Sequence, residues 1–216
     1  IDESIAGRTL FFNIHSSKWS KKCLDLFQIQ ESGLPLLKPV LQNYGLITDT
    51  NLSLQCVIGD QQAALIGQAG ITQGSSAANF GTSASVLYNA GENPAVVDGL
   101  ISSVLYSDGK QRKHVVEGTI NACNSLFYHL EKALCIPHNN MKWDERCANQ
   151  STNGIYIPGF SGLAAPYWKS GFDDVYWNLD QKDKNAIVRA GMESIGFLVK
   201  DILDQLQPIM ESNLES

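Results

Sequence analysis

The sequence lacks the patterns that mark a metal centre or a disulfide framework. Its five cysteines are odd in number and widely spaced, with no C-x-x-C pair, and its four histidines are scattered, with no H-E-x-x-H segment. Zinc sites and disulfide scaffolds need closely spaced ligands or an even set of cysteines. We therefore expect no disulfide framework, no metal-binding residues in this chain, and a reducing, cytoplasmic location.

Long apolar runs and an excess of positive charge are also missing. No stretch approaches the roughly 20 apolar residues that span a membrane, and the acidic start at residues 1–4 is unlike a signal peptide. The chain has 16 Lys and Arg against 22 Asp and Glu, a formal net charge of -6. Nucleic-acid binders normally show a basic face. We expect no membrane and no nucleic-acid partner, and we leave a homo-oligomer open.

What remains is the composition of an ordinary globular protein. The chain has 216 residues, of which 44% are hydrophobic, enough for one large or two small domains with a real core. Residue 1 is isoleucine rather than methionine. We therefore expect that residue 1 is not the natural start and that the chain is a piece of something longer.

Turn residues and hydrophobic spacing predict alternating helices and strands. The expected elements are a helix within 19–29 capped by Ser20, a helix over 61–69 closed by Gly70, two strands within 75–90 around a Gly81-Thr82 turn, strands at 100–106 and 113–116, a helix at about 122–134, and a strand at 155–157. Residues 136–153 are predicted to be a loop with one helical turn at most. Four strands in succession favour an antiparallel meander.

The last element is the clearest helix of the sequence. An apolar stripe at spacings of three and four residues is formed by Val188, Met192, Ile195, Val199, Ile202 and Leu206. We expect Asp183 to cap this helix, Pro208 to stop it, and residues 209–216 to fray.

The most informative stretch for chemistry is residues 59–65, GDQQAAL, followed by the Gly81-Thr82 turn. A carboxylate near a glycine-hydroxyl turn is what phosphoryl transfer to an alcohol needs. The carboxylate takes the hydroxyl proton, and backbone N–H groups receive phosphate oxygens. By itself, however, an Asp at a helix start such as Asp60 is more often a cap, and Gly-Thr between strands is usually a hairpin turn. The pattern alone leaves both interpretations open.

Several segments together carry a more specific pattern. They are residues 6–15 (AGRTLFFNIH) with Trp19, residues 59–65 (GDQQAAL), residues 80–83 (FGTS), residues 159–168 (GFSGLAAPYW) and residues 189–195 (RAGMESI). In order and spacing they resemble the FGGY family of carbohydrate kinases. The resemblance implies an actin-like, ribonuclease-H-like α/β fold with a mixed sheet flanked by helices, incomplete here. Residues 1–58 would close the first domain, and residues 59–216 would begin the second.

The resemblance also implies an activity and the residues that serve it. The family transfers a phosphoryl group from ATP, with Mg²⁺, to a hydroxyl of glycerol or a related polyol or sugar. By this likeness Asp60 is the general base, and Asp60 and Gln61 bind the acceptor. Gly81 and Thr82 contact the nucleotide phosphates, and Asn124 stands at a nucleotide-binding position. The Pro166-Tyr167-Trp168 segment is expected to be structural.

Three positions depart from the family pattern. Asn124 and Tyr128 replace a glycine and a glutamine that contact nucleotide, and Ser85 replaces an aromatic residue that packs on the acceptor. The phosphate loop of the first domain, with its magnesium-linked aspartate, is absent from this chain. Two alternatives follow. One is a kinase for a pentose or ketose sugar rather than glycerol. The other is an actin-like binding module that no longer catalyses.

Overall fold

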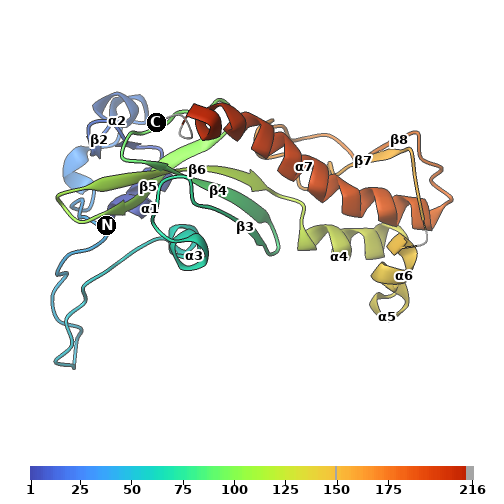
Figure 1. Cartoon of the computed structure of the whole chain (residues 1–216), viewed down its shortest axis with the longest axis horizontal. Helices are drawn as coiled ribbons and strands as arrows, with labels where there is room; N and C mark the ends of the chain where they lie inside the picture. Colours follow the sequence, from blue (N-terminus) through green and yellow to red (C-terminus); the bar gives the residue numbers. More distant parts are fainter. Residues whose placement is uncertain (149, 213–216) are drawn as a thin grey trace.

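The computed structural model describes residues 1–148 and 150–212. Its centre is an antiparallel sheet of four strands, β3 (Ser76–Phe80), β4 (Ala84–Gly91), β5 (Ile101–Ser107) and β6 (Arg112–Ile120), shown in Figure 1. All four expected strands are therefore present. Among the described strands every ladder is antiparallel, and the one parallel pairing is an isolated bridge between Asp2 and Lys38. The expected mixed sheet is thus antiparallel in this part of the fold.

The strands do not form the simple meander that we expected. Their order is β3-β4-β6-β5, so β6 returns to the centre and β5 lies at an edge. The β3–β4 and β5–β6 pairs are hairpins, but the connection over 92–100 is too long for a tight turn and carries the chain past β6. Strand β6 also runs to Ile120 rather than ending at Val116. Glu117 and Gly118 look like strand breakers in sequence, yet an ion pair accommodates the first and close helix packing requires the second.

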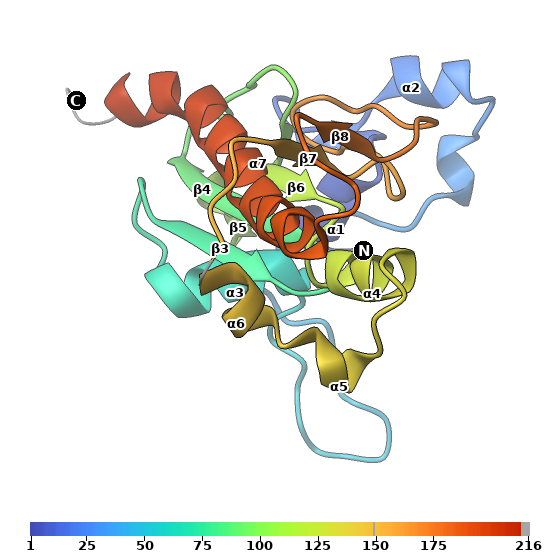
Figure 2. The ribbon, with the colours of Figure 1, turned by 90° about the vertical axis from the view of Figure 1, so that its right-hand side faces the viewer.

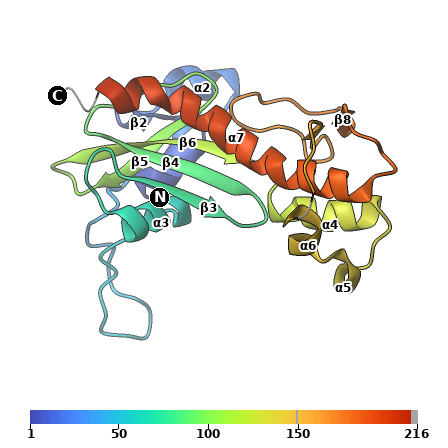
Figure 3. The same cartoon turned by 45° about the vertical axis from the view of Figure 1, so that its right-hand side comes forward.

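One face of the sheet is covered by the long helix α7 (Lys184–Ser212), as Figure 3 shows. Leu198, Ile202 and Leu206 pack on alternate residues of β4 and β6, so the predicted apolar stripe does face the core. The Asp183 carboxylate accepts hydrogen bonds from the N–H groups of residues 185 and 186, which confirms the cap.

The prediction that Pro208 stops this helix is wrong. Pro208 lies inside α7, which continues to Ser212. A proline removes one backbone hydrogen bond, but Leu206 is buried and Ile209 and Met210 pack on the same core, so tertiary contacts hold the last turn. Residues 213–216 of the predicted frayed tail lie outside the described residues.

Helices α1 (Glu3–Arg8) and α3 (Asp60–Ala69) cover the opposite face of the sheet. Leu65 of α3 packs with Leu87, Leu105 and Val115. Helix α1 lies so close to β5 that a Cβ on Gly7 would come within 2.9 Å of the Ser103 Cβ. The molecule therefore has three layers, with α7 on one side of the sheet and α1 and α3 on the other.

The chain between α1 and α3 forms smaller elements and a projecting arm. A hairpin of β1 (Phe12–Asn13) and β2 (Lys18–Trp19) precedes α2 (Lys21–Leu26), which Ser20 caps as expected, and the 3-10 turn η1 (Glu31–Gly33). Isolated bridges then join Leu41 with Cys56 and Leu46 with Ser53. Figure 2 shows this arm extending away from the layered body.

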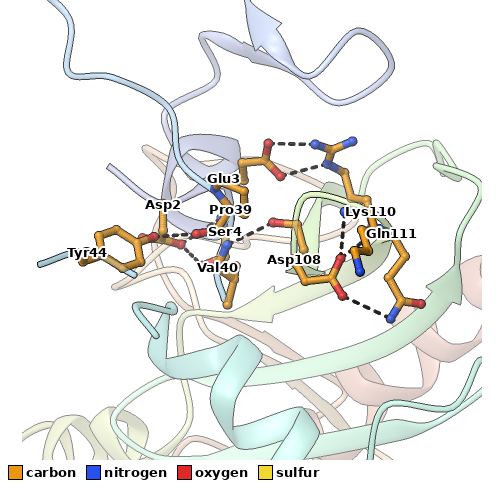
Figure 4. Close-up of polar contacts among 11 residues, drawn as sticks. Asp2, Glu3, Ser4, Pro39, Val40, Tyr44, Asp108, Lys110 and Gln111 are labelled. Carbon is orange, nitrogen blue, oxygen red and sulfur yellow. Dashed lines mark hydrogen bonds and ion pairs between the residues drawn. The ribbon is translucent and has the colours of Figure 1, made fainter. Parts of the chain in front are cut away.

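Polar contacts tie the base of the arm and the start of α1 to the sheet, as Figure 4 shows. The Asp2 carboxylate caps α1 by accepting from the N–H groups of Ser4 and Ile5. Glu3 accepts two hydrogen bonds from the Arg112 guanidinium, at 2.9 and 2.7 Å. The Tyr44 hydroxyl donates to the Pro39 carbonyl at 2.6 Å, and burial, with the nearby Asp2 carboxylate, raises the pKa of Tyr44 to about 12. The start of α1 and the base of the arm are thus attached to the sheet, and the proposed division at 58/59 stays a prediction.

A second core lies beyond the end of the sheet. It gathers α4 (Asn124–Ala133), α5 (His138–Met141), α6 (Trp143–Ala148), β7 (Ile155–Ile157), β8 (Val175–Trp177) and the first turns of α7. Helix α4 and strand β7 were expected, whereas the two short helices exceed the single turn predicted for 136–153. Strand β8 was not predicted, because three residues are too few to show an alternating pattern. No described helix is long and apolar enough to cross a membrane.

Candidate functional site

The first turn of α3 presents a carboxylate to solvent. Asp60 is the first residue of the helix and is exposed, and one carboxylate oxygen accepts from the Gln61 N–H at 2.8 Å. The preceding Gly59 donates its N–H to the Ser4 hydroxyl, and a Cβ there would lie 2.4 Å from the Gln62 side-chain oxygen. Buried Gln62 and the close fit at Gly59 therefore fix the helix start, while the Asp60 carboxylate stays accessible.

Gln61 connects this carboxylate to the β3–β4 hairpin. Its side-chain oxygen accepts a hydrogen bond from the Asn79 amide at 3.0 Å. Asn79 lies on β3, two positions before Gly81. The structure thus places Asp60 next to a residue that reaches the strand leading into the Gly81-Thr82 turn.

The turn at residues 81–83 is exposed and rests on the start of α4. The Gly81 and Thr82 carbonyls accept hydrogen bonds from the N–H groups of Asn124 and Ser125, at 3.0 and 3.1 Å. Gly81, Thr82 and Asn124, which are far apart in sequence, therefore meet through backbone contacts. All three are exposed at this junction.

Not every N–H group of the turn is available to a ligand. The Gly81 N–H donates to the Ser83 carbonyl at 2.8 Å, and the first N–H groups of α4 are used by the turn and by the Cys123 carbonyl. Within the described part of the chain, the N–H groups of Thr82 and Ser83 have no hydrogen-bond partner. These two groups and the adjacent hydroxyls are the donors that could receive phosphate oxygens.

A polar network that sequence reasoning missed lies on the sheet face covered by α3. The Glu117 side chain on β6 is 1% exposed, forms an ion pair with Arg8 of α1, and accepts from the Ser85 hydroxyl at 3.1 Å. The signal in the sequence was Glu117 itself, since a lone acid between Val116 and Gly118 in a strand is rarely buried without a partner. Arg8 could not be identified as that partner from spacing.

The described residues can also be compared with what a magnesium site needs. Among the described residues no group of three or more His, Cys, Asp or Glu side chains could hold a metal ion. Mg²⁺ in nucleotide sites is often bound by one or two carboxylates together with phosphate oxygens. The described residues therefore offer no such cluster by themselves, and the absence of metal ligands stays a prediction.

The glycine-rich segment after β7 is held by Asp174. Its carboxylate accepts from the Gly159 and Phe160 N–H groups at 2.9 and 3.0 Å and from the Tyr156 hydroxyl at 2.7 Å, and it pairs with His129 of α4. Burial alone would raise the pKa of Asp174, but the hydrogen bonds from Tyr156, His129 and the backbone hold it below its ordinary value.

The Pro166-Tyr167-Trp168 segment, which we expected to be structural, forms hydrogen bonds to two other parts of the chain. The Tyr167 hydroxyl donates to Asp201 at 2.9 Å, and the Trp168 indole N–H donates to the Gly99 carbonyl at 2.7 Å. These contacts attach the segment to α7 and to the chain before β5, and neither directs a reactive group toward Asp60.

Comparisons with known proteins give a family match and several relatives. The model of the FGGY family of carbohydrate kinases, C-terminal domain, matches residues 76–212. The glycerol kinase of Limosilactobacillus reuteri is 33% identical over 214 residues, covering 95% of this chain and 43% of that protein. Glycerol kinase 1 of Thermotoga maritima shows the same identity and coverage.

Solved structures show the same fold. Plasmodium falciparum glycerol kinase with ADP has a TM-score of 0.81 at 33% identity and covers 97% of this chain and 44% of its own. A ligand-bound xylulose kinase from Lactobacillus acidophilus has a TM-score of 0.79 at 20% identity, covering 95% of this chain and 44% of its own. The expected actin-like, ribonuclease-H-like fold is confirmed. The chain spans less than half the length of the relatives that it matches.

Proposed function

Because this chain belongs to the FGGY family of carbohydrate kinases, we propose that the intact protein carrying it transfers the γ-phosphoryl group of ATP to a hydroxyl of glycerol or a related polyol or sugar. The observation that carries the proposal is the link from Asp60 through Gln61 and Asn79 to the Gly81-Thr82 turn. This link supports the proposal because it connects the proposed base to the strand that leads into the proposed phosphate-binding turn.

In the proposed reaction Asp60 is the general base. One of its oxygens is used by the Gln61 N–H, and the other is free to take the acceptor proton. As that proton moves to Asp60, the acceptor oxygen bonds to the γ-phosphorus and the bond from this phosphorus to the ADP oxygen breaks. Gln61 binds the acceptor through its amide N–H₂, because Asn79 already occupies its oxygen.

The nucleotide side of the proposed site is the turn. Thr82 offers a free N–H and a hydroxyl to the phosphates, Gly81 lets them approach the backbone, and Asn124 borders the same junction. Magnesium bound with the nucleotide would neutralise phosphate charge, and this chain contributes positioning rather than a metal-ligand set.

Replacement of Asp60 by Asn in the intact protein tests the proposal. We expect phosphorylation, screened over glycerol, xylitol and common pentoses, to fall by about 10²–10⁴-fold in Asp60→Asn, the usual effect of losing a general base. The control is Asp25→Asn, which changes an exposed acid on a different helix, α2, and should leave the rate unaltered. Equal turnover by Asp60→Asn and the unchanged protein would show that Asp60 is not the base.

A second candidate is an actin-like binding module without catalysis. The observation that favours it is the surface of α4, where Asn124 and the 68% exposed Tyr128 stand one turn apart in place of the expected glycine and glutamine. Calorimetric titration with ATP separates the two. Binding of ATP supports the kinase, whereas binding of a sugar without any binding of ATP supports the module.

Substrate and location also belong to the proposal. The glycerol kinase relatives favour glycerol or a similar polyol, with a pentose or ketose sugar as the alternative acceptor. The five cysteines are all free thiols, which supports the reducing, cytoplasmic setting expected from the sequence.

A further inference from the structure

The buried acid Glu117 joins two elements that flank the proposed acceptor site. Its side chain is 1% exposed, and its two oxygens are occupied by the Arg8 guanidinium and by the Ser85 hydroxyl. A buried carboxylate needs both charge compensation and hydrogen bonds to be tolerated. Both oxygens of the Glu117 carboxylate therefore have a partner.

Strand register places the network beside the base and the turn. Ser85 pairs with Asn79 on β3 and with Thr119 on β6. Asn79 is also the residue that donates to Gln61, the neighbour of Asp60. The Ser85 hydroxyl thus lies one strand away from the contact that holds the acceptor side of the proposed site, and three positions after Thr82.

Helix α1 brings Arg8 to the same place. The Ser4 hydroxyl of α1 accepts from the N–H of Gly59, the residue before Asp60, and Arg8 follows one turn later along the helix. Arg8, Ser85 and Glu117 consequently lie between the start of α3 and the sheet end at which the turn meets α4.

Arg8 is only partly used by this network. Its side chain is 33% exposed, and within residues 1–148 and 150–212 only its Nη1 has a hydrogen-bond partner. The Nε and Nη2 N–H groups are left as donors in the planar geometry of a guanidinium, which suits two neighbouring oxygen atoms.

Attachment of α1 to the sheet does not depend on this ion pair. The start of the helix is already fixed by the two hydrogen bonds from Arg112 to Glu3, and its last turn by the close packing of Gly7 on Ser103. The ion pair of Glu117, which is buried in the middle of β6, is therefore not needed to hold the helix, and its presence indicates another role.

We propose that Arg8, fixed by Glu117 and Ser85, is a further acceptor-binding residue, and that it selects acceptors with hydroxyl groups beyond the one that is phosphorylated. The inference rests on the proposed function for the identity of the ligand. The guanidinium donates two hydrogen bonds to adjacent hydroxyl oxygens, while Asp60 faces the reacting hydroxyl.

The test is calorimetric binding of xylitol and of glycerol to the intact protein without ATP. Arg8→Gln should weaken xylitol binding about 10-fold or more, the scale of a lost hydrogen bond to a charged group, and weaken glycerol binding less. Arg112→Gln is the matched control, because it removes the other ion pair between α1 and β6 at the opposite end of the helix. It should leave both affinities unchanged.

Two milder variants keep the test decisive if Arg8→Gln fails to fold. Ser85→Ala leaves the ion pair in place, and Arg8→Lys keeps the charge but not the planar donor pair. Each should raise the KM for the acceptor several-fold without changing the KM for ATP. A structural role alone would lower stability and leave the acceptor KM unaltered.

The outcomes separate this inference from the proposed function. Unchanged polyol affinity in Arg8→Gln, equal weakening in Arg8→Gln and Arg112→Gln, or no polyol binding by the unchanged protein overturns the inference. Phosphoryl transfer that depends on Asp60 but not on Arg8 would leave the proposed function standing and remove Arg8 from the site.

Discussion

At the scale of single residues, strand β6 carries two buried titratable side chains, one with hydrogen-bond partners and one without. Glu117 is compensated by Arg8 and Ser85, as a buried charge requires. His114, three residues earlier on β6, is 3% exposed, and neither ring nitrogen has a hydrogen-bond partner among the described residues. The difference follows from the neighbours of each residue, which strand pairing supplies.

His114 should make stability depend on pH. Burial lowers the pKa of His114 below its ordinary value, with the Arg112 charge adding to the shift; backbone groups of Gly91, Glu92 and Ile14 oppose it without reaching hydrogen-bond geometry. The unfolded chain therefore binds more protons than the folded one once the pH drops below about 6.5, so stability falls as the pH decreases.

The measurement is the free energy of unfolding of the intact protein between about pH 7.5 and pH 5. We expect His114→Phe to lose part of the decline on acidification, because phenylalanine cannot be protonated. His15→Gln, at an exposed histidine, is the control and should follow the unchanged protein. Parallel curves for His114→Phe and the unchanged protein would contradict the assignment.

At the scale of elements, the helices α2, α3, α4 and α7 formed where local patterns indicated them, but the elements that each one packs against did not follow from those patterns. Helix α3 (Asp60–Ala69) begins one residue earlier than predicted, with Gly59 rather than an acidic side chain at its N-cap, and it ends before Gly70 as expected. Helix α7 begins after Asp183, the predicted cap. Strand β6 outlasts its predicted end because Gly118 admits Ile202 of α7. A contact between residues so far apart has no local signature.

That contact gives a prediction for the α7–sheet interface. A Cβ on Gly118 would lie 2.4 Å from the Ile202 Cγ2. Gly118→Ala should therefore lower the free energy of unfolding by about 1–3 kcal/mol, the usual effect of overpacking.

The control is Gly196→Ala, at an open position of α7, where the added methyl group meets nothing within 4 Å. This control should be neutral or stabilising by up to about 1 kcal/mol. Denaturant unfolding of both variants is the measurement, and equal stability of the two would contradict the packing argument.

At the scale of the whole molecule, the proposed site is open on the side away from the sheet. Asp60, Gly81, Thr82 and Asn124 are all exposed. The chain spans 43% of the length of the glycerol kinase relatives, and phosphoryl transfer depends on holding both reactants in line. The proposed base and the proposed phosphate-binding turn would supply one side of such a site.

We expect the 216-residue chain by itself to show no phosphoryl transfer. An ADP-release assay with ATP and glycerol or xylitol should give the background rate for the isolated chain and turnover for the intact protein. The isolated Asp60→Asn chain is the control for contaminating activity. Turnover by the isolated chain above that control would show that these residues complete the site.

The sequence by itself determined the family, the helices α3 and α7, and the presence of the four strands of the two hairpins. The candidate site that it indicated, Asp60, Gln61, Gly81, Thr82 and Asn124, stays a prediction. These features are encoded by caps, turns and periodicity within a few residues, or by motif order along the chain. Only the tertiary structure decided the strand order β3-β4-β6-β5, the continuation of α7 past Pro208, the docking of the turn on α4, and the pairing of Arg8 with Glu117. Each of these depends on contacts between distant residues, whose free energy is settled by burial and charge compensation in the folded chain rather than by local preference.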